Sequence, residues 1–179
     1  MKNVGTNCNQ MKNILLALLT LLIITSCAST DPKREIRFVY DYEDILTDEE
    51  EKKFDFLFRE HEKLTSNEIV LVTTPNYGED KDILFFSVNF SNKLGIGKAG
   101  KNNGVLIVFS RANKETRIST GYGAEKVLKD EIAKRYIDNI MIPRFIEGNF
   151  YEGLYAGSQT IVEFLEQPGN EIKTGTNSK

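Results

Sequence analysis

The chain of 179 residues has little of what metal and redox sites commonly use: one histidine, two cysteines and no tryptophan. The single histidine, His61, excludes zinc sites built from several histidines and phosphotransfer through a histidine pair. A metal site in this chain would therefore depend on oxygen ligands, which favour calcium or magnesium. The formal net charge of -3 provides no excess of basic residues, so no nucleic-acid partner is expected.

No hydrophobic run is long enough to cross a bilayer, which takes ~20 residues. The run from Ile14 to Ile24 follows Lys12 and has the layout of a secretory signal peptide. It ends in Ile-Thr-Ser-Cys at Cys27, which resembles the lipobox of bacterial lipoproteins. We predict a lipoprotein signal over residues 1–27 with lipidation of Cys27. An ordinary signal peptide with an incidental cysteine is the alternative.

The start of translation is open between Met1 and Met11, because Met11 repeats the Met-Lys-Asn of the first residues. A start at Met11 would leave out Cys8, and in both cases the mature domain keeps no cysteine for a disulfide or a thiol nucleophile. Residues 28–37 are polar and are predicted to tether the domain. We therefore expect a protein of the cell envelope, lipid-anchored to a membrane and facing the periplasm or the exterior.

Residues 38–166 carry the pattern of one globular domain, and the polar residues 167–179 are predicted to be a disordered tail. Thr47 and Glu50 form a capping-box sequence that begins a helix up to Thr65. Apolar residues recur at helical spacing along it, namely Phe54, Leu57, Phe58 and Leu64. His61 lies on or near this stripe, and we interpret it as a packing residue.

Short β-branched runs predict strands over Glu68–Thr74, Gly104–Ser110 and Glu115–Thr120. Further helices are predicted from Asp80 or Asp82 to Leu94, around 126–139 and around 151–165, with Pro143 and Gly148 between the last two. A strand-helix-strand unit covered by helices gives an α/β fold, a three-layer α/β/α sandwich with a small mixed sheet. The first two predicted strands should be parallel.

The loop before the second predicted strand contains the pattern G-x-G-x-x-G, formed by Gly95, Gly97 and Gly100. Nucleotide-binding loops of this kind follow a strand and precede a helix, whose N-terminus holds phosphate. Here a helix is predicted to end at Leu94 and a strand to begin at Gly104. The loop would then lie at a helix C-terminus, whose carbonyl groups repel phosphate. We predict no nucleotide cofactor, and Gly95 as a helix C-cap.

Four stretches in order resemble the signatures of the TPM-domain family. The first, "LGIGKAGKNNGVLIVFS", resembles W-G-I-G-x-x-G-x-D/N-N-G-V-L, and the others are "FVYDYEDIL", "RISTGYGAEKVLKD" and "IPRFIEGNFYEG". Together they cover nearly the whole mature domain. The family includes thylakoid lumen proteins, bacterial envelope proteins and animal membrane proteins. Leu94 stands in place of the family's usual Trp and Glu43 in place of its Ala.

The matched segments gather acidic and amide side chains that could hold Ca²⁺ or another divalent cation: Asp41, Asp44, Asn103, Glu125 and Asp130. A candidate loop site consists of Gly95, Gly97, Gly100, Asn102, Gly121, Tyr122 and Gly123. The two glycine loops should share one edge of the sheet, and Asp41 would reach them if the N-terminal segment crosses that edge. The alternative is that these residues are loop caps, helix caps and turn residues.

The resemblance implies two functions. One is a binding, assembly or maintenance module for membrane proteins. The other is a metal-dependent phosphatase that acts on phosphomonoesters. No catalytic residue can be named, since no cysteine remains and no other nucleophile stands out. We therefore favour the binding module, with a membrane-protein partner, over the phosphatase. A passive envelope protein is a third interpretation. Phe85 and Tyr122 are the aromatic residues expected to be most exposed.

Overall fold

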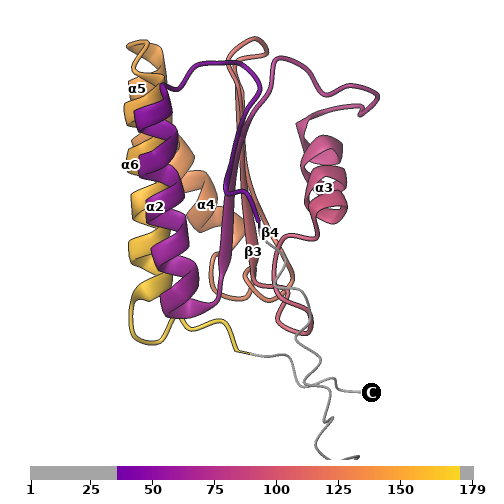
Figure 1. Cartoon of the computed structure of the whole chain (residues 1–179), viewed down its shortest axis with the longest axis vertical. Coiled ribbons are helices and arrows are strands. Elements are labelled where there is room, and N and C mark those ends of the chain that lie inside the picture. Colours follow the sequence, from indigo (N-terminus) through magenta and orange to yellow (C-terminus); the bar gives the residue numbers. More distant parts are fainter. Residues whose placement is uncertain (1–35, 174–179) are drawn as a thin grey trace, which may run out of the picture. The chain divides into compact units, whose positions relative to one another are not determined.

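The computed structural model describes residues 36–173 (Figure 1). Cys27 and most of the predicted tether lie outside these residues. The elements are β1 (Val39–Asp41), α2 (Asp48–Thr65), β2 (Glu68–Thr73), α3 (Ile83–Leu94), β3 (Gly104–Ser110), β4 (Glu115–Thr120), α4 (Asp130–Tyr136), the π-helix η1 (Ile137–Met141), α5 (Ile142–Ile146) and α6 (Phe150–Glu166). In this part of the chain, no helix is both long and apolar enough to span a membrane.

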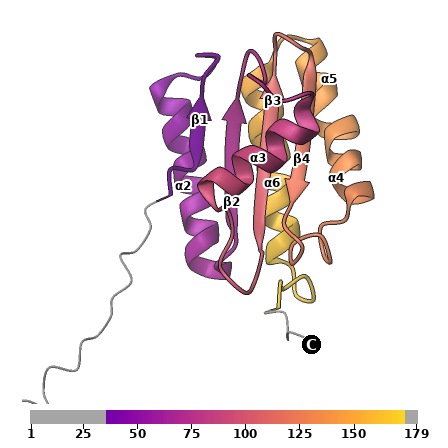
Figure 2. The same cartoon turned by 90° about the vertical axis from the view of Figure 1, so that its right-hand side faces the viewer.

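One sheet has the strand order β1-β2-β3-β4 (Figure 2). The first three strands are parallel, as predicted for β2 and β3, and β4 returns antiparallel to β3. The sequence indicated only an extended segment where β1 lies, because three residues are too few to show an alternating pattern. The sheet is therefore mixed, with β1 and β4 at its edges.

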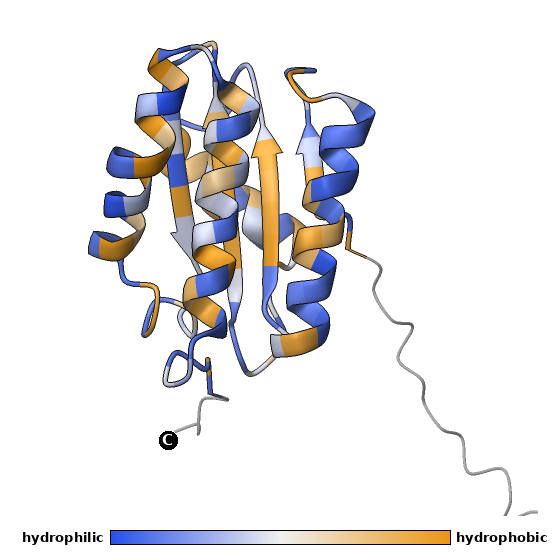
Figure 3. Ribbon diagram, turned by 90° about the vertical axis from the view of Figure 1, so that its left-hand side faces the viewer, coloured by the Kyte–Doolittle hydropathy of each residue, from blue (hydrophilic) through white to orange (hydrophobic). Residues whose placement is uncertain are grey.

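Helices cover both faces of the sheet, which confirms the three-layer α/β/α sandwich. Helix α3 lies alone on one face, and α2, α4, α5 and α6 lie on the other (Figure 1). Side chains of β2 alternate between the two layers: Ile69 and Leu71 belong to the larger core cluster, and Val70 and Val72 to the cluster under α3. The hydropathy colours show β2 as largely hydrophobic between helices that carry both hydrophilic and hydrophobic stretches (Figure 3).

Helix α2 begins with the predicted capping box. The Thr47 hydroxyl accepts from the backbone N–H of Glu50, and the Glu50 carboxylate accepts from the N–H of Thr47. Phe54, Phe58 and His61 are buried as predicted. Leu64 is 71% exposed, contrary to the predicted stripe, because the four-residue spacing from His61 reaches Thr65 instead.

The segment around Pro143 differs from the prediction of a break. The chain stays helical from α4 through η1 into α5, with Pro143 in the first turn of α5. Because proline has no N–H to donate to the preceding turn, the regular helical ladder is interrupted there, and that turn is the π-helix η1. The segment lies close against α6, since a Cβ on Gly157 would be 2.1 Å from Cε of Met141.

The residues after α6 also differ from the prediction of a disordered tail. The amide of Asn170 donates to the carbonyl of Phe164 at 2.8 Å, and Ile172 is only 9% exposed within the larger core cluster. The prediction is therefore wrong for the described residues of this tail, because one apolar side chain in a polar run is enough to hold it against the domain.

Candidate functional site

The two glycine loops lie side by side at the amino ends of β2 and β3, as predicted. The backbone N–H groups of Gly123 and Ala124 donate to the carbonyl of Asn102 at 2.9 and 3.2 Å. The N–H of Gly121 donates to the carbonyl of Gly104 at 2.9 Å. Backbone hydrogen bonds therefore join the loop after α3 to the loop after β4.

Glycine is required here by the close approach of the two loops. A Cβ on Gly123 would lie 1.9 Å from the carbonyl oxygen of Lys101, and one on Gly121 would lie 2.5 Å from that of Asn102. Gly95 ends α3 in the left-handed conformation (φ 63), which confirms the predicted C-cap. The helix-loop-strand order is confirmed too, so the glycines serve backbone packing and turns at the end of a helix.

Asn103 is fully buried beneath these loops. Its Nδ2 donates to the carbonyl of Ser66 at 2.9 Å and to Oδ1 of Asn67 at 3.0 Å. Its Oδ1 accepts from the backbone N–H of Lys98 at 2.8 Å. Both ends of the amide are thus engaged in holding the loop, and this favours the alternative of a structural turn residue over a metal ligand.

An ion pair between buried Glu68 and partly exposed Lys98 supports the same loop and was not expected from the sequence. Glu68 is 1% exposed and accepts from the N–H of Gly97 and from Nζ of Lys98, both at 2.6 Å. Lys98 also pairs with Glu62. Partial burial lowers the pKa of Lys98, but the hydrogen bonds and charges of Glu62 and Glu68 outweigh it and raise this pKa above its usual value. Lys98 therefore stays charged at neutral pH.

Asp41 lies at the opposite end of the sheet. It pairs with Thr73, which pairs with Phe109 near the carboxyl end of β3. Its Oδ2 accepts from the N–H groups of Ile45 and Leu46 at 2.9 and 2.8 Å, and its Oδ1 accepts from the Thr73 hydroxyl. The condition under which Asp41 would reach the glycine loops is therefore not met, because parallel pairing places the end of β1 beside the end of β2.

Glu43 connects this carboxyl end to the turn between β3 and β4. Its carboxylate accepts from the backbone N–H groups of Arg111 and Ala112 at 2.8 and 3.0 Å. Its own N–H donates to the hydroxyl of Thr73 at 3.2 Å. The glutamate that departs from the family pattern thus fixes the turn that carries Arg111.

The five predicted metal ligands do not form one site. Asp41 and Asp44 lie at the carboxyl ends of the parallel strands, Asn103 and Glu125 lie near the amino ends, and Asp130 begins α4. Over residues 36–173, no three His, Cys, Asp or Glu side chains converge where an ion could be held. Oxygen donors suit Ca²⁺, but those of Asp41 and Asn103 already accept hydrogen bonds. Binding of Ca²⁺ or another divalent cation stays a prediction.

His61 is a packing residue, as interpreted from the sequence. It is 1% exposed, and its Nδ1 lies 2.7 Å from Oε1 of Glu166. Its Nε2 faces the side-chain amide of Asn67 at 3.5 Å, which suits a neutral ring protonated on Nδ1. Burial lowers the pKa of His61 and outweighs the opposing effect of Glu166.

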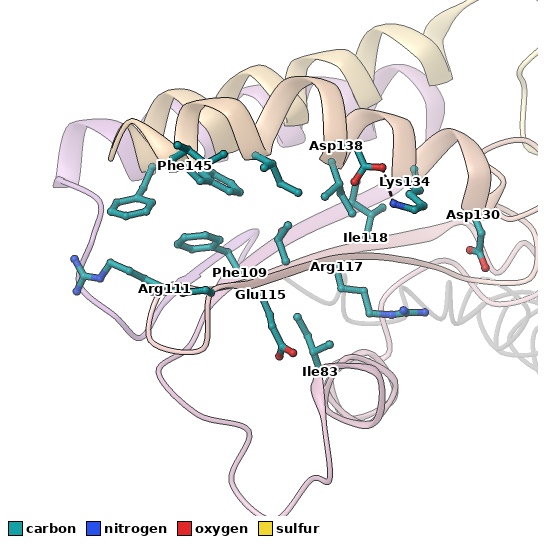
Figure 4. A pocket seen from close by; sticks show the side chains of 17 residues that line it. Ile83, Phe109, Arg111, Glu115, Arg117, Ile118, Asp130, Lys134, Asp138 and Phe145 are labelled. Carbon is teal, nitrogen blue, oxygen red and sulfur yellow. Dashed lines mark hydrogen bonds and ion pairs between the residues drawn. The ribbon is translucent and has the colours of Figure 1, made fainter.

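A groove of about 950 Å³ runs along β4, a feature that the sequence did not indicate (Figure 4). One wall comes from the helical segment α4-η1-α5, and Ile83 of α3 lies on the other side. The apolar side chains that line the groove are Ile83, Phe109, Ile118, Ala133, Ile137, Ile142, Phe145, Ile146 and Phe150. Finding this groove requires knowing that β4 is an edge strand, which is a property of the assembled sheet.

Basic side chains without an acidic partner line the groove. Arg111, Lys114 and Arg117 form no ion pair with any residue from 36 to 173. Three acidic residues also line the groove: Glu115 accepts from the Tyr77 hydroxyl at 2.5 Å, Asp138 pairs with Lys134, and Asp130 begins α4. The helix side of the groove is thus mainly apolar, with charged residues only on α4 and η1. Along the strand, three basic side chains outnumber the one carboxylate of Glu115.

The TPM-domain family model matches residues 39–164. This chain belongs to the TPM-domain family. The match extends from β1 almost to the end of α6, so it covers the whole sheet, both glycine loops and the groove of this TPM domain. No curated protein matches the chain.

Three solved structures are similar to this TPM domain. The N-terminal domain of a P. gingivalis protein is 29% identical with a TM-score of 0.68, over 78% of this chain and 88% of that one. The BA42 protein of the psychrophilic bacterium Bizionia argentinensis is 27% identical with a TM-score of 0.60, over 75% and 98%. The N-terminal domain of the Corynebacterium glutamicum protein cg2496, 11% identical with a TM-score of 0.57 over 84% and 90%, shares the fold.

Proposed function

We propose that this protein is a lipid-anchored binding module of the cell envelope, which recognises a membrane-protein partner through the groove along β4. The observation that carries the proposal is the groove itself, where apolar side chains and basic side chains without acidic partners meet at an open sheet edge. Protein interfaces combine an apolar centre with arginine and aromatic residues in the same way.

The polar residues at the two ends of the sheet support this proposal because their side-chain oxygens are already used in hydrogen bonds within the domain. Asp41, Glu43 and Asn103 use their oxygens to accept backbone hydrogen bonds within the domain. The groove instead presents exposed side chains at its rim, with Ile146 81% and Ile142 36% exposed. These exposed apolar side chains lie beside the basic residues, which is why we assign the partner to the β4 groove.

The predicted anchor would favour partners in the same membrane. Ten residues, 28–37, would link lipidated Cys27 to β1, and a chain of that length spans at most about 35 Å. A tether of this reach raises the local concentration of the domain near membrane proteins. The groove would then need only modest affinity. A Cys27→Ala protein that still fractionates with membranes would contradict the lipid anchor.

Site-specific photo-crosslinking in membranes tests the proposal. A photoreactive residue is introduced in place of Ile146 at the groove rim, or in place of Phe56, which is 68% exposed on α2 and does not line the groove. We expect a discrete crosslinked membrane protein from position 146 and none from position 56. Charge reversal by Arg117→Glu should abolish the product at 146. The same products from both positions, or none from either, would reject the proposal.

A further inference from the structure

We infer that the groove binds an extended peptide segment as an additional strand on β4, and that this segment alternates apolar and acidic side chains. The inference rests on the proposed function and specifies its partner. Strand addition to an open sheet edge gives affinity through main-chain hydrogen bonds, and specificity through alternate side chains.

The outer edge of β4 has backbone groups available for such pairing. The hydrogen bond from the N–H of Gly121 to the carbonyl of Gly104 marks a hydrogen-bonded pair of the antiparallel ladder. Because such pairs alternate with non-bonded pairs, Thr116, Ile118 and Thr120 point their N–H and C=O groups away from β3. Among residues 36–173, no strand pairs with β4 on that side.

The two faces of β4 lie in different chemical surroundings. The Ser119 hydroxyl donates to that of Ser87 on α3 at 2.9 Å, so Arg117 and Ser119 lie on the α3 face. Ile118 is 4% exposed and belongs to the core cluster with Met141 on the opposite face. Figure 4 shows Arg117 on the same side of the strand as Ile83, and Ile118 on the side of Phe145.

An added strand would repeat this alternation, because residues directly opposite each other in a sheet share a face. The residue opposite Ile118 would face the apolar wall made by Ile137, Ile142 and Phe145. The residue opposite Arg117 would face the guanidinium group, and the end of the segment near the β3–β4 turn would meet Arg111 and Lys114. Apolar side chains fit the first position. Carboxylates fit the face of Arg117, where the three basic side chains outnumber the carboxylate of Glu115.

The charge of the groove distinguishes this occupant from a second copy of the chain. Pairing β4 with β4 of another copy would bring two sets of Arg111, Lys114 and Arg117 together with only two Glu115 carboxylates, so positive charge would stay in excess. An acidic segment neutralises these residues instead. The π-helix η1, a feature that is frequent at functional sites, forms part of the apolar wall through Ile137.

The test uses synthetic peptides and the full-length protein in detergent. The first peptide alternates valine and glutamate over seven residues, the second alternates valine and lysine, and the third is the first with alternate backbone nitrogens methylated. Fluorescence anisotropy measures the affinity for each peptide, and amide hydrogen exchange measures protection of the protein backbone.

The valine-glutamate peptide should bind and should protect the amides of Thr116, Ile118 and Thr120. The other two should bind at least about tenfold more weakly, since one loses charge pairing and the other the ladder.

Arg117→Glu should shift preference to the valine-lysine peptide, whereas Arg135→Glu, an exposed arginine on α4 that does not line the groove, should change nothing. Binding without protection of the three amides, or equal binding of the methylated peptide, would overturn strand addition. A dimer that Arg117→Glu alters would also overturn it. Specific crosslinks from position 146 together with no amide protection would leave the proposed function standing and reject this inference alone.

Discussion

The two ends of the sheet hold their loops by different means. At the amino ends of β2 and β3, the loops touch through glycine backbone above the buried amide of Asn103 and the ion pair of buried Glu68 with Lys98. At the carboxyl ends, partly exposed carboxylates of Asp41 and Glu43 accept backbone hydrogen bonds. The close backbone contact at the amino ends leaves no space for larger side chains. The hydrogen bonds at the carboxyl ends fix the turn that carries Arg111. Substitutions at the amino ends should therefore reduce stability, and those at the carboxyl ends should reduce binding in the groove.

The largest effect should come from Gly123→Ala. The added Cβ would lie 1.9 Å from the backbone oxygen of Lys101, so the two loops would have to separate. We expect a loss of about 4 kcal/mol in the free energy of unfolding, measured by urea denaturation. Gly100→Ala in the neighbouring loop is the control, because a Cβ there meets nothing within 4 Å but requires φ +76. It should cost about 1 kcal/mol. Equal losses would show that close packing is not the cause.

Asn103→Ala should have the next largest effect. The substitution leaves the carbonyl of Ser66, Oδ1 of Asn67 and the N–H of Lys98 without their partner in a buried region. We expect a loss of about 2–3 kcal/mol in the free energy of unfolding. Asn102→Gly, at an exposed neighbour with φ 49, is the matched control and should cost nothing. Asn103→Ala with wild-type stability would contradict the structural role.

Asp41→Ala should cost less stability, about 1–2 kcal/mol, since the site is only partly buried. It removes the acceptor for the N–H groups of Ile45 and Leu46. Peptide binding should weaken because the neighbouring Glu43 and the β3–β4 turn lose support. The same variant tests the phosphatase alternative in a phosphomonoester assay with and without divalent metal. Activity in the wild type that Asp41→Ala abolishes would favour that alternative over a binding module.

The pH dependence should be smaller and should come from His61. Burial lowers the pKa of His61 in the folded state, so folding favours the neutral ring. The contribution of neutral His61 to the free energy of unfolding is complete above the unfolded pKa of about 6.5. It is lost as the pH falls below that value. Because the chain has one histidine, His61→Gln should flatten the melting temperature between pH 7.5 and pH 5, values chosen to bracket about 6.5. An unchanged slope would contradict this assignment.

The smallest expected effect is that of calcium. The predicted ligands Asp41 and Asn103 are held at opposite ends of the sheet, so no single site joins them. A cation bound elsewhere would raise the melting temperature by mass action. We expect a shift below about 2 °C at millimolar Ca²⁺, which corresponds to less than about 0.5 kcal/mol. A large shift that Asp41→Ala removes would show that Asp41 belongs to a calcium site.

Local signals in the sequence predicted most of the fold. The capping box at Thr47, the C-cap at Gly95 and the strand Gly104–Ser110 lie where the pattern indicated, because each depends on neighbouring residues only. Phe85 and Tyr122 are 50% and 80% exposed, as expected. The adjacency of the two glycine loops was predicted because the Ser110–Glu115 hairpin makes β4 return to the end of the sheet where β3 begins.

The candidate site was less predictable, because it depends on contacts between distant segments. The placement of Asp41 required knowing that β1 pairs with β2 in parallel, and a strand of three residues shows no such pattern. The groove depends on β4 being an edge strand. It also depends on η1, which joins α4 to α5 in one helical segment. Neither the edge position nor a π-helix has a local signature in this sequence.

The central claim is that recognition occurs at the β4 edge and not at the ends of the sheet. The most direct test is an NMR titration of the isotope-labelled protein with the valine-glutamate peptide. We predict chemical-shift changes over Glu115–Thr120 and Ile137–Met141, with the loops at 95–103 and 121–125 unchanged. Changes centred on those glycine loops, with β4 unaffected, would contradict it.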